Sequence, residues 1–102
     1  MSGMDPFSAL ADPTRRAIIE LLAQRGEMPA TEIAAQFAIS APAVSQHLRV
    51  LRESGLVQVE KQAQRRLYRI DPTVMLEVEG WARRTREIWN QRLDALERFL
   101  RE

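Results

Sequence analysis

The side chains best suited to molecular recognition lie in the middle third of the chain. Ser45 and Gln46 can each donate and accept hydrogen bonds through a hydroxyl or an amide group. Between residues 40 and 70 the chain carries six basic and two acidic residues, whereas the remainder carries nine basic and twelve acidic residues. The net charge of the whole chain is therefore only +1. A basic segment flanked by acidic ones predicts a local surface that faces a polyanion.

Other kinds of chemistry lack the residues that they need. The chain has no cysteine and a single histidine, His47, which excludes disulfides, thiolate metal sites, cysteine nucleophiles and histidine-rich metal clusters. No nucleophile–base pair, phosphate-binding loop or carboxylate pair stands out, so we predict that the chain is not an enzyme and needs no cofactor. It also lacks a secretory signal and an apolar run of the roughly 20 residues that a membrane span requires, which makes the cytoplasm the expected location.

Three Asp-Pro pairs mark the expected starts of helices. An Asp side chain can accept hydrogen bonds from the free N–H groups of a first helical turn, and Pro fits the first helical position because it lacks an N–H. Together with the spacing of apolar residues, these pairs predict helices over residues 6–11, 13–24 and 72–101. The segment Gly26–Met28 is expected to form a loop.

Two further helices, over residues 30–37 and 41–54, predict a helix-turn-helix at about 30–54 because only a short turn separates them. Val44, Leu48 and Leu51 form the buried stripe of the second helix. Its opposite face could lie in the major groove of DNA, with Gln46 pairing with adenine and Ser45 donating or accepting a hydrogen bond. The residues predicted to contact bases or phosphates from this helix are Ser40 at its cap, Ala41, Pro42, Ser45, Gln46, Arg49 and Arg52.

The apolar period changes to two after this helix, which predicts strands over residues 56–61 and 67–70. The polar segment between them contains no Asn-Gly or Asp-Gly pair, so we expect a turn longer than two residues. Its tip, with Gln64, Arg65 and Arg66, could reach the DNA backbone or minor groove. The sequence therefore predicts one domain over residues 1–102, mainly α-helical, with a small β-hairpin wing at about 56–70.

The last predicted helix, over residues 72–101, has apolar residues at coiled-coil spacing, and so long a helix cannot bury all of them on a domain this small. We therefore predict a homodimer in which the first and last helices meet their copies. The predicted interface residues are Phe7, Leu10, Val78, Trp81, Trp89, Leu93, Leu96 and Leu100.

Four stretches of the chain, residues 9–16, 40–52, 54–57 and 65–72, resemble the ArsR/SmtB family of bacterial winged-helix repressors. The resemblance implies a winged helix-turn-helix that forms a homodimer, binds a palindromic, inverted-repeat operator in double-stranded DNA and represses transcription. It also implies that the positions equivalent to Ala41, Pro42, Ser45 and Gln46 meet the DNA and that the wing tip adds further contacts.

The sequence departs from the metal-sensing members of that family. It has no cysteine at the start of the recognition helix and no histidine on the last helix, so we expect neither a metal site nor metal sensing. Two other functions stay open. A winged helix can bind an acidic protein instead of DNA, and would then form no sequence-selective DNA complex. Alternatively, Trp81 and Trp89 could hold an unknown organic effector, which would stabilise the dimer against heat.

Overall fold

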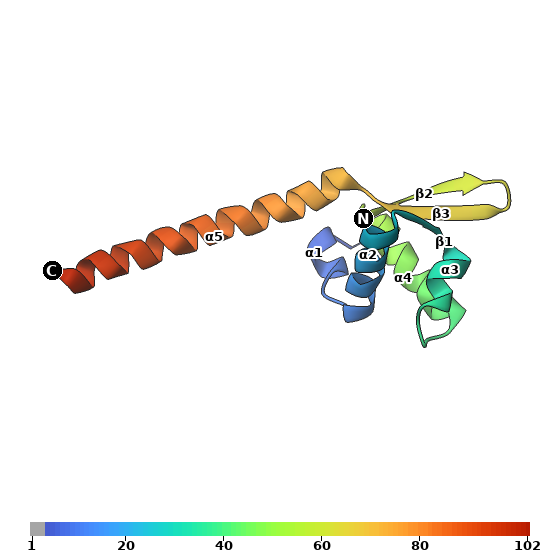
Figure 1. Ribbon diagram of the computed structural model, residues 1–102, viewed down its shortest axis with the longest axis horizontal. Coiled ribbons are helices and arrows are strands. Elements are labelled where there is room, and N and C mark those ends of the chain that lie inside the picture. Colours follow the sequence, from blue (N-terminus) through green and yellow to red (C-terminus); the bar gives the residue numbers. More distant parts are fainter. Residues whose placement is uncertain (1–3) are drawn as a thin grey trace.

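The computed structural model describes residues 4–102, which form five helices and three strands, and one apolar core lies in the body of the domain (Figure 1). In chain order these elements are α1 (Pro6–Ala9), α2 (Pro13–Arg25), β1 (Glu27–Pro29), α3 (Ala30–Ala35), α4 (Ala41–Glu53), β2 (Val57–Gln62), β3 (Arg65–Ile70) and α5 (Pro72–Arg101). The hairpin of β2 and β3 and the long helix α5 extend from the helical body in opposite directions (Figure 1). The molecule is therefore elongated, with dimensions of 68 × 29 × 26 Å.

The three Asp-Pro pairs begin helices α1, α2 and α5, as predicted. Asp5 accepts hydrogen bonds from the backbone N–H groups of Phe7 and Ser8, and Asp71 accepts one from Thr73. Asp12 caps α2 in the same way. The helix α1 ends at Ala9, two residues before the predicted end, because Asp12 must adopt extended backbone as the cap and as the residue before Pro13. The helix α3 ends at Ala35, also two residues early.

The core lies where α2, α3 and α4 meet the sheet. Its deeply buried members include Ile18 and Leu22 of α2, Ile33 of α3, and Leu48 and Leu51 of α4, all at most 1% exposed. Val44 completes the predicted buried stripe of α4. Because one face of α4 is fixed in the core, the opposite face has a defined orientation in solvent.

The sheet has three strands in the order β1-β3-β2, so the prediction of a loop at Gly26–Met28 was wrong. Residues Glu27–Pro29 form β1, which pairs with β3 in antiparallel register. Met28 lies opposite Tyr68 and is buried, while Glu27 lies opposite Arg69 and forms an ion pair with it at 3.4 Å. Burial of Met28 in the core therefore draws this short segment into the sheet.

The prediction of a long turn in the hairpin was also wrong. Gln62 pairs with Arg65, which leaves Ala63 and Gln64 as a two-residue turn. Ala63 has a φ of 57°, a left-handed conformation that two-residue hairpin turns require and that an alanine rarely adopts. Gln64 does lie in the turn, but Arg65 and Arg66 belong to β3 and are not tip residues.

The helix α5 has no buried residue, and every residue from Trp81 to its end is exposed. Its first turns touch the body of the domain, where Val74 and Met75 pack against the core and Trp81 contacts Phe7 of α1. Within residues 4–102, no helix combines the length and the apolar character needed to cross a membrane.

Candidate nucleic-acid interface

The helix α4 is anchored at both ends as well as along its buried stripe. At its start, the Ser40 side chain accepts a hydrogen bond from the backbone N–H of Ala43 at 3.2 Å. At its end, Gly55 has a φ of 84°, and the Leu56 N–H donates to the carbonyl of Leu51 at 3.0 Å. This C-terminal cap turns the chain directly into β2 and fixes the wing relative to α4.

The predicted DNA-contacting residues of α4 share its solvent face. Ala41, Pro42, Ser45, Gln46, Arg49 and Arg52 are all exposed, as is the capping residue Ser40. Small residues occupy the first turn, so the backbone there can come close to a ligand. Longer polar and basic side chains follow along the helix. This face is therefore small and polar at its N-terminal end and basic at its C-terminal end.

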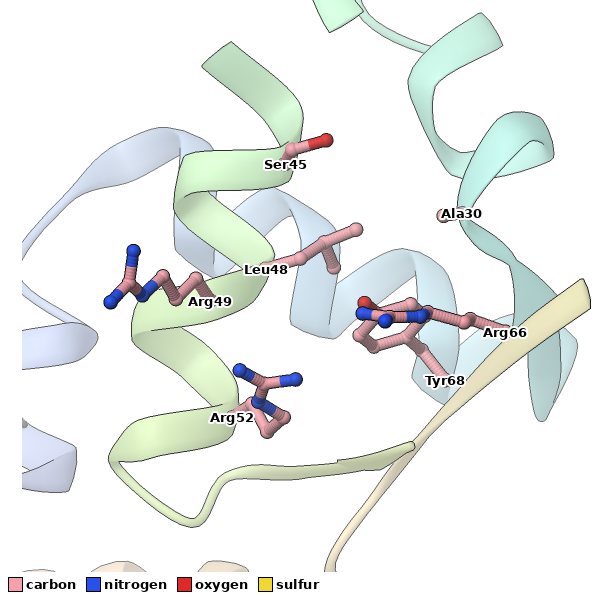
Figure 2. Close-up of a pocket in the computed structure, with 7 residues that line it drawn as sticks. All are labelled: Ala30, Ser45, Leu48, Arg49, Arg52, Arg66 and Tyr68. Carbon is pink, nitrogen blue, oxygen red and sulfur yellow. The ribbon is translucent and has the colours of Figure 1, made fainter. Parts of the chain in front are cut away.

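A hollow of about 260 Å³ separates α4 from the wing (Figure 2). Figure 2 shows the Arg66 and Tyr68 side chains reaching from β3 toward α4, where Leu48 faces them and Arg52 extends from the far end of the helix. The residues that line the hollow are Ala30, Ser45, Leu48, Arg49, Arg52, Arg66 and Tyr68. The structure thus brings the predicted residues Arg52 and Arg66, from two separate elements, to one basic concavity, while the Arg49 side chain points away from it (Figure 2).

The arginines in this region differ in their partners. Arg49 donates from Nε to Glu53 at 2.8 Å, and Arg69 is within 3.8 Å of both Glu27 and Glu60. In contrast, the part of the chain that the structure describes offers no carboxylate within ion-pair distance of Arg52, Arg65 or Arg66. Their charges remain available to an anion outside the protein.

The register of the wing adds a basic residue that sequence reasoning missed. Lys61 lies directly opposite Arg66 in the β2–β3 ladder. Like charges in such a pair destabilise a hairpin unless an anion compensates them. The pairing could not be found from the sequence because it depends on the length of the turn at Ala63 and Gln64.

A second hollow, of about 250 Å³, lies on the α3 side of the wing. It is lined by Gln64, Arg65 and Arg66 together with Pro29, Ala30 and Thr31. Arg66 thus borders both hollows, and the three predicted wing residues remain together on the exposed hairpin. Thr31 and Tyr68 were not among the predicted site residues.

The predicted dimer residues form an apolar face on α1 and α5. The Phe7 ring packs edge-on against the Trp81 ring, with centroids 5.1 Å apart, yet both side chains remain about half exposed. Trp89, Leu93, Leu96 and Leu100 are also exposed, whereas Val78 is half-buried and Leu10 packs partly against the core of its own chain. Ile88, which the prediction omitted, is 67% exposed and lies seven residues after Trp81, a spacing that could have identified it.

Asp71, Asp12 and His47 make their contacts with residues of the domain itself. Hydrogen bonds lower the pKa of Asp71, chiefly one from the Gln58 side chain, and the pKa of Asp12, chiefly one from the Arg15 backbone. His47 is half-buried on the side of α4 that faces α2, with Nδ1 3.9 Å from Asp12. Over residues 4–102, no three His, Asp or Glu side chains converge in a way that could hold a metal ion.

Comparison with protein families places this geometry among known regulators. Residues 10–60, half of the chain, match a family model described as a helix-turn-helix domain. The chain is 49% identical over 67 residues to the HTH-type transcriptional regulator Rv2034 of Mycobacterium tuberculosis, covering 66% of this chain and 62% of that protein. It is 37% identical over 75 residues to the transcriptional repressor SdpR of Bacillus subtilis, covering 74% of this chain and 82% of that protein.

Solved structures of transcriptional regulators share the fold of this chain. The ArsR family transcriptional regulator RHA00566 superposes with a TM-score of 0.75 at 36% identity, covering 82% of this chain and 91% of that one. The homodimeric winged helix-turn-helix domain Mb0332 of Mycobacterium bovis superposes with a TM-score of 0.64 at 26% identity, covering 85% and 91%. The chain therefore belongs to the ArsR/SmtB family of winged helix-turn-helix transcriptional regulators, which are not enzymes.

Proposed function

We propose that this protein is a homodimeric repressor that binds an inverted-repeat operator. The observation that carries the proposal is the exposed polar face of α4 beside arginines that have no carboxylate partner in the described chain. Ser45 and Gln46 would read base edges in the major groove, with Ala41 and Pro42 close to the DNA. Arg49, Arg52 and the cap residue Ser40 would hold phosphates, which requires Arg49 to leave Glu53.

The wing supports this assignment through its charge. Gln64, Arg65 and Arg66 would contact the backbone or minor groove beside the major groove that α4 occupies. DNA phosphates would also relieve the repulsion between Lys61 and Arg66 across the hairpin. An acidic protein partner would meet the same charges, but it would make no use of the small polar turn at the start of α4.

The dimer is supported by the apolar face of α1 and α5. Two copies of this face would bury Phe7, Trp81, Trp89, Leu93, Leu96 and Leu100, which are exposed in one chain, together with Leu10 and Val78 at its inner edge. A two-fold axis through it makes a palindrome the natural target, because the two copies of α4 would then meet equivalent half-sites. Occupying a promoter in the cytoplasm in this way would block RNA polymerase.

We further propose that the regulator does not sense soft metals. Thiolate and imidazole are the ligands that such metals prefer. The chain contains no cysteine, and its single histidine faces Asp12 and Arg15 at the junction of α2 and α4.

Selection from random DNA tests the proposed function. Purified protein should enrich an inverted repeat, and a labelled copy of that repeat should shift in a gel at far lower protein concentration than a scrambled copy. In a transcription reaction from a promoter that overlaps the repeat, the protein should reduce the amount of transcript. Failure to enrich any repeat would contradict the proposal and favour a protein partner.

A further inference from the structure

One arginine of α2 joins three helices. The Arg15 guanidinium donates from Nε to the carbonyl oxygen of Ala9 at 2.7 Å and from Nη2 to that of Ser8 at 3.5 Å, both at the end of α1. Its Nη1 lies 3.4 Å from Nδ1 of His47 on α4. Its own backbone N–H donates to Asp12, which fixes the start of α2 beneath the guanidinium.

The contact with His47 has a defined chemistry. A guanidinium carries five N–H donors and no acceptor, so a hydrogen bond between these two side chains requires Nδ1 of His47 to be the acceptor. The planar group of Arg15 can point donors at α1 and α4 at once because they leave it in fixed directions. A lysine ammonium on a flexible stem has no such fork.

The two ends of this bridge belong to different functional surfaces. On one side, α1 carries Phe7, whose ring lies against Trp81 on the apolar face of α5. On the other side, His47 is the immediate neighbour of Gln46 on α4. The helix α1 has only four residues, and these hydrogen bonds to its final carbonyls tie it to the body of the domain together with the buried Ala9.

We propose that Arg15 is a positioning residue that transmits the arrangement of the two subunits to α4. This inference rests on the proposed function, in which α1 and α5 form the dimer interface. Pairing of the subunits fixes α1, Arg15 carries that position to His47, and α4 is held in the orientation that reads DNA. Dimerisation then raises the affinity of each single subunit for DNA. This effect is separate from the higher affinity that a dimer gains by binding two half-sites at once.

A DNA half-site isolates this coupling because it engages one copy of α4. Half-site affinity per subunit is measured for the wild-type dimer and for the Leu96→Glu variant, whose monomeric state is verified by sedimentation. Each is also measured with Arg15→Lys. The wild-type dimer should bind about tenfold more tightly than the monomer. Arg15→Lys should lower the dimer to the level of the monomer and leave the monomer unchanged.

Arg16→Lys is the matched control. Arg16 donates to the two residues that follow α1, at 2.7 Å to the carbonyl of Leu10 and 3.2 Å to that of Ala11, but its side chain makes no hydrogen bond to α4 within residues 4–102. It should lower the melting temperature about as much as Arg15→Lys does and leave the difference between dimer and monomer intact. If Arg15→Lys fails to fold, His47→Leu removes the acceptor from the other side and should give the same pattern.

The outcomes separate this inference from the proposed function. A wild-type protein that selects no operator contradicts the function itself. An operator-binding protein whose dimer and monomer bind the half-site equally contradicts only the role of Arg15. Equal losses from Arg15→Lys in dimer and monomer, or the same effect from Arg16→Lys, would also contradict it by showing a purely structural role.

Discussion

Single residues of α4 divide into those that hold the helix and those that face solvent. Leu48 is buried, whereas Ser45 and Gln46, three and two residues earlier, are exposed. This division followed from the apolar spacing of the sequence because a helix repeats every 3.6 residues. The bridge from Arg15 to His47 could not be predicted in this way, since it joins residues 32 positions apart through the packing of two helices.

Replacing Gln46 with alanine should weaken operator binding by about 1–3 kcal/mol, because a bidentate contact with a base is lost. Affinity for random DNA should change much less, since phosphate contacts remain. Fluorescence anisotropy titrations with both DNAs measure the two losses. Gln24→Ala, at an exposed position of α2, is the matched control and should change neither. Equal losses on operator and random DNA would remove Gln46 from base readout.

Asp71 gives the domain part of its sensitivity to acid. The hydrogen bond from Gln58 lowers the pKa of Asp71 in the folded state below the ordinary value of 3.8. Its stabilising effect is therefore complete above pH 3.8 and is lost as the pH falls through the lowered pKa. Asp71→Asn keeps a side-chain oxygen that can cap α5 but has no carboxylate to protonate.

The melting temperature of Asp71→Asn should therefore fall less between pH 5 and pH 2.5 than that of the wild type, as followed by circular dichroism. Asp5 and Asp12 also have lowered pKa values, so part of the acid sensitivity should remain in the variant. A fall in melting temperature over this pH range equal to that of the wild type would contradict the role of Asp71.

At the scale of elements, the sequence predicted the helices and strands whose own residues contain a recognisable pattern. The Asp-Pro caps and the apolar stripes located five helices because both signals lie within the helix itself. The strand β1 was missed because three residues are too few to show a period, and its partner β3 lies about forty residues later. The hairpin turn was missed because Ala63 is not a residue that favours a left-handed conformation.

The wing should contribute phosphate contacts. Replacing both Arg65 and Arg66 with alanine should reduce the slope of log K against log salt concentration by about 1–2, since each lost phosphate contact releases about one fewer counterion. Titrations at several salt concentrations give the slope. Arg25→Ala, at the exposed end of α2, supplies the control and should leave the slope unchanged. An unchanged slope in the wing variant would argue against contact between the wing and DNA.

The outer part of α5 should determine the oligomeric state. Leu96→Glu places a charge on the apolar face and should convert the dimer into a monomer that remains folded, because no residue of α5 is buried in its own chain. Analytical ultracentrifugation and circular dichroism measure the two properties. Gln91→Glu introduces the same side chain at another exposed position of α5, off the apolar face, and should leave the dimer intact. A dimeric Leu96→Glu protein would contradict the proposed interface.

At the scale of the whole molecule, the elongated shape follows from one helix that the domain cannot cover. The wing and α5 project in opposite directions from the body, so the charged surface and the apolar face are separated (Figure 1). The sequence predicted this division because basic residues gather at 40–70 and apolar residues at coiled-coil spacing follow. It did not predict the hollow between α4 and β3, which depends on the side chains of two packed elements.

The central claim is that two copies of α4 occupy successive major grooves on one side of the DNA, about 34–36 Å apart. Inserting about five base pairs between the half-sites of the selected operator rotates one half-site to the opposite side of the duplex. The affinity for this DNA should fall to that for a single half-site, and inserting about ten base pairs should restore part of it. Equal affinity for the original and the five-base-pair operator would contradict the account.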